Sequence, residues 1–201
     1  MVAPLTAVLD LLFGERLLGP ILTEEVGAVF EDWHWNRKLG GRSVATESQA
    51  RQEHLDGRMF VERVGPAIDR LLQFNDEQRQ RVRVASQWYW RAESEADNVI
   101  RFVGYWLVLE ALELGEKANI GPLKSNIAKL LTVEKSAVTE QVGRLYGLRN
   151  KLLHGKQRVV TNEDVERVRA LAVALLESHT LGKVSSGRLA ALHDALSPSS
   201  G

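Results

Sequence analysis

The segment Arg149-Asn150-Lys151-Leu152-Leu153-His154-Gly155 places a guanidinium, a side-chain amide and an imidazole at the end of an apolar helical pattern. An imidazole exchanges protons near neutral pH, and a guanidinium binds phosphate oxygens through paired N–H groups. Arg149, Asn150 and His154 are therefore the candidate catalytic residues. Their side chains suit phosphodiester chemistry that needs no metal ion.

The spacing of this Arg and His carries little information by itself. The chain is rich in Arg, and it repeats the same spacing at Arg188 and His193. What distinguishes the first pair is its neighbour, because Asn150 follows Arg149 whereas an apolar Leu189 follows Arg188.

Helix geometry limits what one copy of the motif can do. Asn150 and His154 are four residues apart and share a helix face, so we expect the amide to orient the imidazole. Arg149 and His154 are five residues apart, about 140° around the axis. They can act on one substrate only if the helix end is distorted or if a second copy faces the first. The geometry therefore predicts a homodimer with the site at its two-fold axis.

Glu110 is a supporting candidate from another part of the chain. It lies between Leu109 and Ala111, in the most apolar helical stretch. Because a buried carboxylate is costly unless it is paired, we expect an Arg partner from a neighbouring helix, Arg149 or Arg144. The alternative is a Glu at the helix edge that faces solvent.

Cations and aromatic residues near these positions allow two readings each. Three cations flank the motif: Lys151, Lys156 and Arg158. They are candidate substrate-binding residues that contact phosphates, and the alternative is that they form a solvated helix end. Upstream, Trp88-Tyr89-Trp90 follows a basic stripe of Arg side chains. These rings are suited to base stacking, but core packing is the favoured reading. His54, His179 and His193 are expected at the surface. No pair of these histidines has metal-ligand spacing, so we predict no metal and no cofactor.

Helices are the elements that must position these residues, because helical periodicity dominates and proline is scarce. Capping residues are expected at Asn75 with Gln78, at Ser94 with Asp97, at Ser136, and at Thr161 with Asp164, while Gly155 ends a helix. The predicted helices cover residues 5–13, 22–35, 58–73 with a break at Gly65-Pro66, 76–92, 95–114, 121–131, 136–153 and 161–178.

The predicted fold class is all-α: an antiparallel helical bundle of four to five core helices with additional N-terminal helices. The helix over 95–114 is apolar nearly all round, which places it at the centre. We expect three regions: an N-terminal helical extension of unclear role at 1–60, the bundle at 61–180, and a partly disordered tail at 181–201.

Composition restricts the partners and the compartment. Lys plus Arg and Asp plus Glu both total 26, so any contact with nucleic acid must come from a local patch. Cysteine is absent, which excludes disulfides and thiolate chemistry. The N-terminus is a poor signal peptide, and the longest apolar stretch is too short and too charged to span a membrane. We therefore expect a cytoplasmic protein.

The order of these motifs resembles the HEPN superfamily, and within it the ApeA-like branch. The resemblance rests on a Trp-x-x-x-Glu-x-Leu pattern at Trp106, Glu110 and Leu112, followed some forty residues later by the Arg149–Gly155 segment. It covers roughly residues 75–178. It implies an all-α bundle that dimerises and joins two Arg–His motifs in one cleft.

The resemblance also implies metal-independent endoribonuclease activity, as in toxins and anti-phage defence effectors. In that case His154 is the general base or acid, Arg149 stabilises the phosphorane, and Asn150 positions His154 or a phosphate. The partners would be RNA, a second copy and an antitoxin or defence-system protein. Lys156 stands where the toxin branch controlled by AMPylation has a Tyr, so that control is not supported. The alternatives are a non-catalytic HEPN module that binds nucleotide, RNA or a protein, and a plain scaffold in which Arg149 pairs with Glu110.

Overall fold

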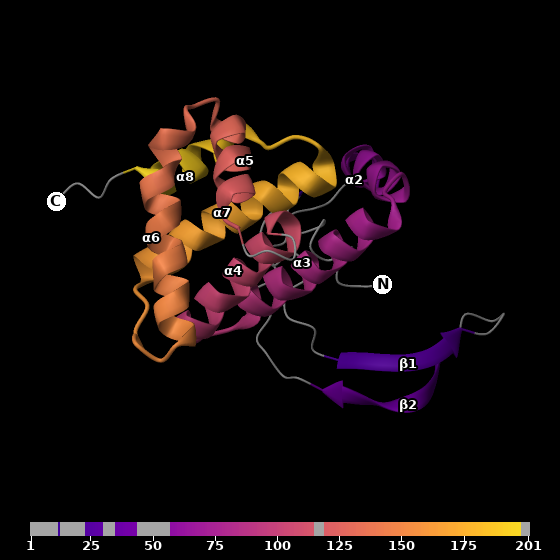
Figure 1. The fold of residues 1–201 in the computed structure, drawn as a ribbon. Helices are drawn as coiled ribbons and strands as arrows, with labels where there is room; N and C mark the ends of the chain where they lie inside the picture. The colour runs from indigo at the N-terminus through magenta and orange to yellow at the C-terminus, as the bar shows by residue number, and fades with distance from the viewer. Residues whose placement is uncertain (1–11, 13–22, 30–34, 44–56, 115–118, 198–201) are drawn as a thin grey trace.

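The computed structural model describes residues 12, 23–29, 35–43, 57–114 and 119–197. Within these ranges, seven α-helices follow a two-stranded hairpin (Figure 1). The helices are α2 (Gly57–Leu72), α3 (Asp76–Ser94), α4 (Asn98–Glu113), α5 (Gly121–Leu131), α6 (Lys135–Leu153), α7 (Asn162–Leu181) and α8 (Ser186–Leu196). The predicted all-α bundle is confirmed for this helical part of the chain.

The hairpin corrects the prediction for the N-terminal region. Strand β1 (Thr23–Val29) pairs antiparallel with β2 (Trp35–Ser43), where a helix over 22–35 and a polar loop after it were expected. Figure 1 shows the hairpin set apart from the helices. A short apolar run does not distinguish a helix from a strand, and pairing with a later segment decides the outcome. The helix predicted over 5–13 lies almost entirely outside the described residues.

Helices α4 and α7 form the centre of the bundle. Their side chains supply most of the largest buried residues, among them Phe102, Trp106 and Leu171. Contacts join Asn98 to Asn162 at one end, so that α4 and α7 run side by side in the same direction. Helix α3 packs antiparallel to α4, and α5 packs antiparallel to α6 (Figure 1). Helices α3 to α7 thus supply most of the core.

Two of the predicted caps are confirmed. Asn75 and Gln78 form a reciprocal capping box at the start of α3. The Thr161 hydroxyl accepts the Asp164 backbone N–H at the start of α7. These side chains satisfy backbone donors that the first helical turn leaves unpaired.

Two other predicted caps are wrong. Helix α3 continues to Ser94, whose hydroxyl donates to the Trp90 carbonyl oxygen, and Asp97 caps α4 instead. Helix α6 begins one residue before Ser136 and has no side-chain cap. In the first case the preceding helix is longer than its sequence pattern indicates, so the capping position moves toward the C-terminus.

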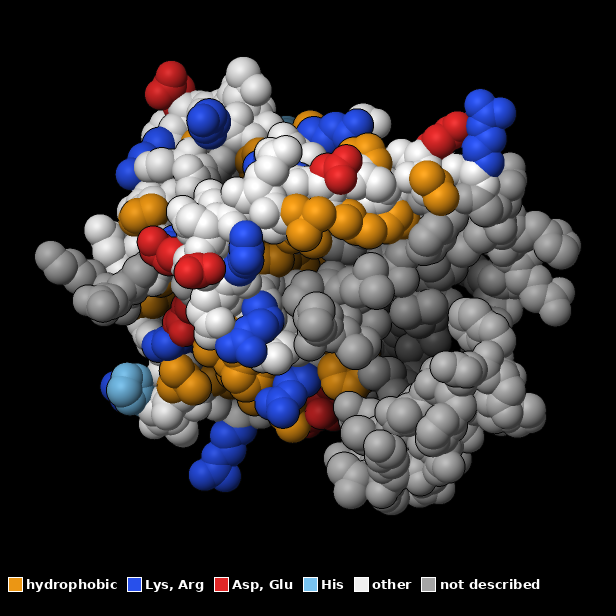
Figure 2. Space-filling view, turned by 90° about the vertical axis from the view of Figure 1, so that its right-hand side faces the viewer, with side chains coloured by type: hydrophobic (Ala, Val, Ile, Leu, Met, Phe, Trp, Pro, Cys, Tyr) orange, Lys and Arg blue, Asp and Glu red, His pale blue; other side chains and the backbone are white. Residues whose placement is uncertain are grey.

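Helix α2 also differs from its prediction, because it continues through Gly65-Pro66 without a break. Val64 and Ala67 on either side of this pair are buried, and this burial outweighs the poor helix propensity of Gly and Pro. The outer side of α2 exposes Val61, Ile68 and Leu72. Figure 2 shows hydrophobic side chains on this side of the molecule, bordered by charged groups.

Helix α8 lies in the segment 181–201, which was expected to be a partly disordered tail. It is an 11-residue helix that packs against α7 and buries Leu192 and Leu196 in the core. The end of the folded domain therefore lies beyond residue 180. In the part of the chain that the structure describes, no helix is both long and apolar enough to cross a bilayer.

Candidate functional site at the α4–α6 junction

The Arg149 side chain joins α6 to α4. Its Nη2 donates to Glu110 Oε1 at 2.6 Å, and its Nη1 donates to Asn150 Oδ1 at 3.1 Å. The predicted pairing of Glu110 with an Arg is therefore confirmed, and the partner is Arg149. The other candidate, Arg144, pairs with Asp164 at 2.9 Å. The two acceptors hold the guanidinium from two sides.

Trp106 completes the support of this ion pair. Its indole N–H donates to Glu110 Oε1 at 2.9 Å, the oxygen that also receives Arg149. The Trp106 ring is buried and packs against Tyr146, with ring centroids 5.8 Å apart. The side chains of Arg149 and Glu110 remain 24% and 25% exposed. The guanidinium is thus held by two half-buried acceptors, one of which a buried indole supports, while part of the Arg149 side chain stays exposed to solvent.

His154 caps the C-terminal end of α6, and Gly155 follows in the left-handed region with a φ of 65°. The Gly155 N–H donates to the Leu152 oxygen at 3.0 Å, and the Lys156 N–H donates to the Lys151 oxygen at 2.8 Å. This pair of bonds is a Schellman motif, which requires the positive φ that glycine adopts without strain. The predicted helix end at Gly155 is confirmed. The His154 side chain is exposed there, without a hydrogen-bond partner among the described residues.

Asn150 does not orient the imidazole, contrary to prediction. Its side-chain oxygen accepts from Arg149, and its backbone oxygen accepts from the His154 N–H at 3.1 Å. The shared helix face was correctly inferred, but the adjacent guanidinium is a stronger hydrogen-bond donor to the amide oxygen than a neutral imidazole N–H. Asn150 therefore positions Arg149 rather than His154.

The three flanking cations surround the helix end. Lys151, Lys156 and Arg158 are exposed, and the described residues supply no ion-pair partner for any of them. Cations near a helix C-terminus also interact favourably with its dipole. The region from Arg149 to Arg158 thus concentrates positive charge on a molecule of zero formal net charge.

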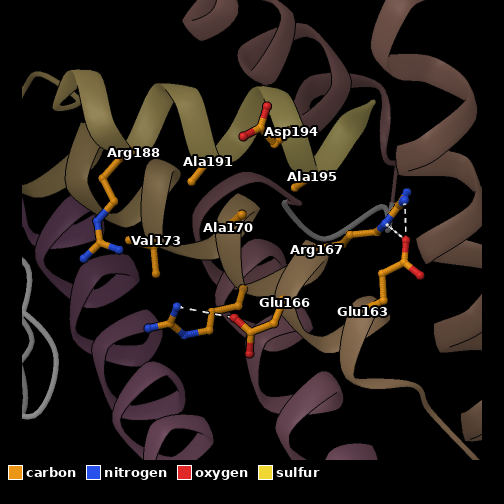
Figure 3. A pocket seen from close by; sticks show the side chains of 10 residues that line it. Glu163, Glu166, Arg167, Ala170, Val173, Arg188, Ala191, Asp194 and Ala195 are labelled. Atoms are coloured by element: carbon orange, nitrogen blue, oxygen red, sulfur yellow. Dashed lines mark hydrogen bonds and ion pairs between the residues drawn. The ribbon is translucent and has the colours of Figure 1, made fainter. Parts of the chain in front are cut away.

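The second Arg–His pair lies elsewhere and has a different environment. Arg188 belongs to α8 and lines a hollow of about 410 Å³ between α7 and α8. Figure 3 shows its side chain near Val173, with Asp194 on the opposite end of α8. His193 is exposed and its nearest acid is Asp194, at 3.7 Å. This pair shares the spacing of the candidate site, but Leu189 stands in place of Asn150, and the Arg188 charge acts on the Glu177 carboxyl of α7.

Two further polar clusters tie helices together and were not found from the sequence. Glu93 accepts from the Tyr105 hydroxyl at 2.9 Å and from Arg169 Nε at 2.8 Å. Burial, and secondly the Glu93 charge, raise the pKa of the Tyr105 hydroxyl well above its ordinary value. Glu93 and Tyr105 are buried and the Arg169 side chain is mostly buried, so this cluster ties α3, α4 and α7 together and stabilises the fold.

His179 belongs to the second cluster: its side chain is 36% exposed, in line with its predicted place at the surface, but it also pairs with a buried acid. Its Nε2 lies 2.8 Å from Glu113 Oε1, and the Glu113 side chain is 4% exposed. Asn126 donates to the other Glu113 oxygen. The signal available in the sequence was Glu113 itself, a second acid in the apolar helix that needs a partner just as Glu110 does. Among the described residues, no group of three or more His, Asp or Glu is arranged to hold a metal ion.

The structure thus defines an all-helical domain with a supported Arg and an exposed His at one helix end. Comparisons of the chain with protein-family models, with curated proteins and with solved structures found no match. Any assignment to a family is therefore a proposal, and it rests on the residues described above.

Proposed function

We propose that this protein is a metal-independent endoribonuclease of the HEPN type that acts as a homodimer. The observation that carries the proposal is the fixed Arg149 guanidinium, held by Glu110 and Asn150 five residues before an exposed His154. A fixed cation and an accessible proton carrier are the two groups that RNA cleavage without a metal requires. The exposed cations around them favour a polyanionic substrate.

The proposed reaction begins with attack of a ribose 2′-oxygen on the adjacent phosphorus. The imidazole of one His154 removes the 2′-hydroxyl proton, and a protonated imidazole returns a proton to the departing 5′-oxygen. The bond from phosphorus to that oxygen breaks, which leaves a 2′,3′-cyclic phosphate and a 5′-hydroxyl. Arg149 stabilises the negative charge that develops on the phosphoryl oxygens.

One copy supplies only half of this arrangement. Arg149 is turned toward α4, whereas His154 is exposed at the helix end, about 140° around the axis from it. Two imidazoles in opposite protonation states would serve as base and acid if a second α6 faced the first. Leu153, which precedes His154, and Val159, which follows the helix end, are 54% and 71% exposed, and they offer apolar surface for that contact.

The test is cleavage of a mixed single-stranded RNA pool in EDTA. We expect Arg149→Ala and His154→Ala each to lower the rate by about 10²- to 10⁴-fold. Arg188→Ala and His193→Ala are matched controls, because they remove the same groups at the same spacing from α8. The controls should cleave like the wild type. Cleavage that persists in both site variants contradicts the site assignment.

The alternative is a non-catalytic module that binds RNA, nucleotide or protein. One observation favours it: the Arg149–Glu110 pair also has the form of a structural tie between helices. In that case the wild type cleaves no RNA. Loss of RNA affinity in Lys151→Ala, Lys156→Ala and Arg158→Ala would then assign a binding role to the same surface.

A further inference from the structure

A second hollow, of about 350 Å³, lies between the end of α3 and the start of α4. It is lined by Trp88, Trp90, Arg91, Ala92, Ser94, Glu95, Ile100 and Gly104. Two tryptophans and a guanidinium in one small concave site are an unusual concentration of groups that bind flat aromatic ligands.

Small residues at the helix crossing form the base of this hollow. A Cβ atom at Gly104 would lie 2.9 Å from the Cβ atom of Ala92, so α3 and α4 approach closely there. Larger side chains stand on both sides of the crossing: Trp90 on α3 and Ile100 on α4. Ile100 is 56% exposed, which leaves an apolar wall facing solvent.

The three consecutive aromatic residues of α3 have different environments. Tyr89 is fully buried in the core, as the favoured reading of the sequence predicts. Trp88 packs partly against the core, and the Arg91 guanidinium lies over its ring at 5.3 Å. Trp90 is half-buried and lines the hollow, and its indole N–H has no partner among the described residues. Trp90 is thus the ring of the three that is most open to a ligand.

We propose that this hollow stacks one unpaired base of the RNA substrate, an inference that rests on the proposed function. Base stacking on an aromatic ring is tolerant of sequence because every base has a π-face. The exposed Arg91 guanidinium, which lies over the Trp88 ring, can also bind the neighbouring phosphate through its N–H groups. The Glu95 carboxylate at the rim can accept from an exocyclic amino group. The preferred substrate is accordingly single-stranded, because bases in a duplex are already stacked.

The hollow lies near the start of α4, and the segment that follows His154 leads to the same end of that helix. Asn98, in the first turn of α4, donates to the Val160 oxygen at 3.4 Å and to Asn162 Oδ1 at 2.7 Å. The segment from His154 to Thr161 therefore ends beside the helix turn that carries Ile100. One RNA strand could contact both places.

The test is equilibrium binding of a fluorescein-labelled single-stranded RNA of mixed sequence, followed by anisotropy in EDTA with the full-length chain. His154→Ala serves as the common background, so that the probe stays intact. We expect Trp90→Leu to weaken binding about 5- to 100-fold, and Trp90→Phe to restore most of the affinity. Arg91→Ala should weaken binding several-fold. Arg83→Ala, about 12 Å away along α3, removes the same charge and should have no effect.

Far-ultraviolet circular dichroism identifies any variant that fails to fold, and Trp90→Phe preserves the test in that event. Unchanged affinity in Trp90→Leu and Arg91→Ala overturns the base site, as does a wild type that binds no RNA. Loss of cleavage in Arg149→Ala would still support the nuclease if only the base site failed. Conversely, Trp90-dependent binding by a protein that never cleaves keeps the base site and removes the nuclease.

Discussion

The Glu110 carboxylate receives two donors from two helices, the Trp106 indole and the Arg149 guanidinium. This arrangement makes Glu110 a positioning residue for Arg149 in the proposed reaction. We expect Glu110→Ala to lower kcat for RNA cleavage by about 10- to 100-fold, since a guanidinium displaced by 1 Å loses its alignment with the phosphorane. Cleavage kinetics at saturating RNA measure this effect.

Glu110→Gln separates alignment from charge. The amide oxygen still accepts from Arg149 and Trp106, so this variant should regain most of the kcat that Glu110→Ala loses. Circular dichroism confirms that both variants fold. A Glu110→Ala protein that folds and cleaves at the wild-type rate shows that Glu110 has no positioning role.

The pairing of Glu110 was predictable because burial costs restrict a carboxylate to few partners. The role of Asn150 was not, because its side chain has two neighbours within reach, Arg149 and His154. Helix periodicity places all three residues but does not rank the donors that compete for one oxygen. Contacts between side chains of one helix turn depend on which of them a second helix has already engaged.

At the scale of single elements, the end of α5 is strained. Thr132 adopts φ 55° and ψ 42°, in the left-handed region, and the Val133 N–H donates to the Ala128 oxygen at 3.0 Å. A β-branched residue in this region costs about 1–2 kcal/mol. Replacing it with glycine removes that cost, but the greater flexibility of glycine in the unfolded chain offsets part of the gain. We therefore expect Thr132→Gly to raise the free energy of unfolding by about 0.5–1 kcal/mol in urea titrations.

The control for this prediction is the equivalent position at the end of α6. Gly155 has a φ of 65°, and a Cβ atom there would meet nothing within 4 Å. Gly155→Ala tests backbone strain without a steric clash, and it should lower the free energy of unfolding by about 1 kcal/mol. Changes of the same sign in the two variants would contradict the strain argument.

Elements were predicted well where local signals decide. Asn75 and Thr161 cap helices through neighbours three residues away, and Gly155 ends α6 through its own backbone freedom. The hairpin at 23–43 was missed because its register depends on pairing between two segments, which no local pattern contains. The hollow beside Trp90 was equally inaccessible, since it requires the close approach of α3 and α4 at Gly104.

At the scale of the whole molecule, α8 closes the bundle over α7. Leu192 and Leu196 anchor it to the core. Where α8 begins, the Glu177 carboxyl of α7 is buried and accepts hydrogen bonds from Ser185. Arg188 and Lys183 act on the same carboxyl through their charges. Packing of the last helix is therefore coupled to one buried acid.

Burial raises the pKa of the Glu177 carboxyl above its ordinary value of 4.5, and the hydrogen bonds and positive charges near it only partly oppose this effect. The folded protein thus binds the Glu177 proton more tightly than the unfolded chain does. The stability gained in this way is complete below the unfolded pKa and is lost as the pH rises through the folded pKa.

Glu177→Gln cannot ionise and escapes the loss. Its free energy of unfolding relative to the wild type should therefore increase from pH 4 to pH 7, as measured by urea titration. Glu140→Gln, which removes an exposed carboxylate from α6, controls for the loss of one negative charge. A difference between Glu177→Gln and the wild type that stays constant or shrinks over this range contradicts the argument.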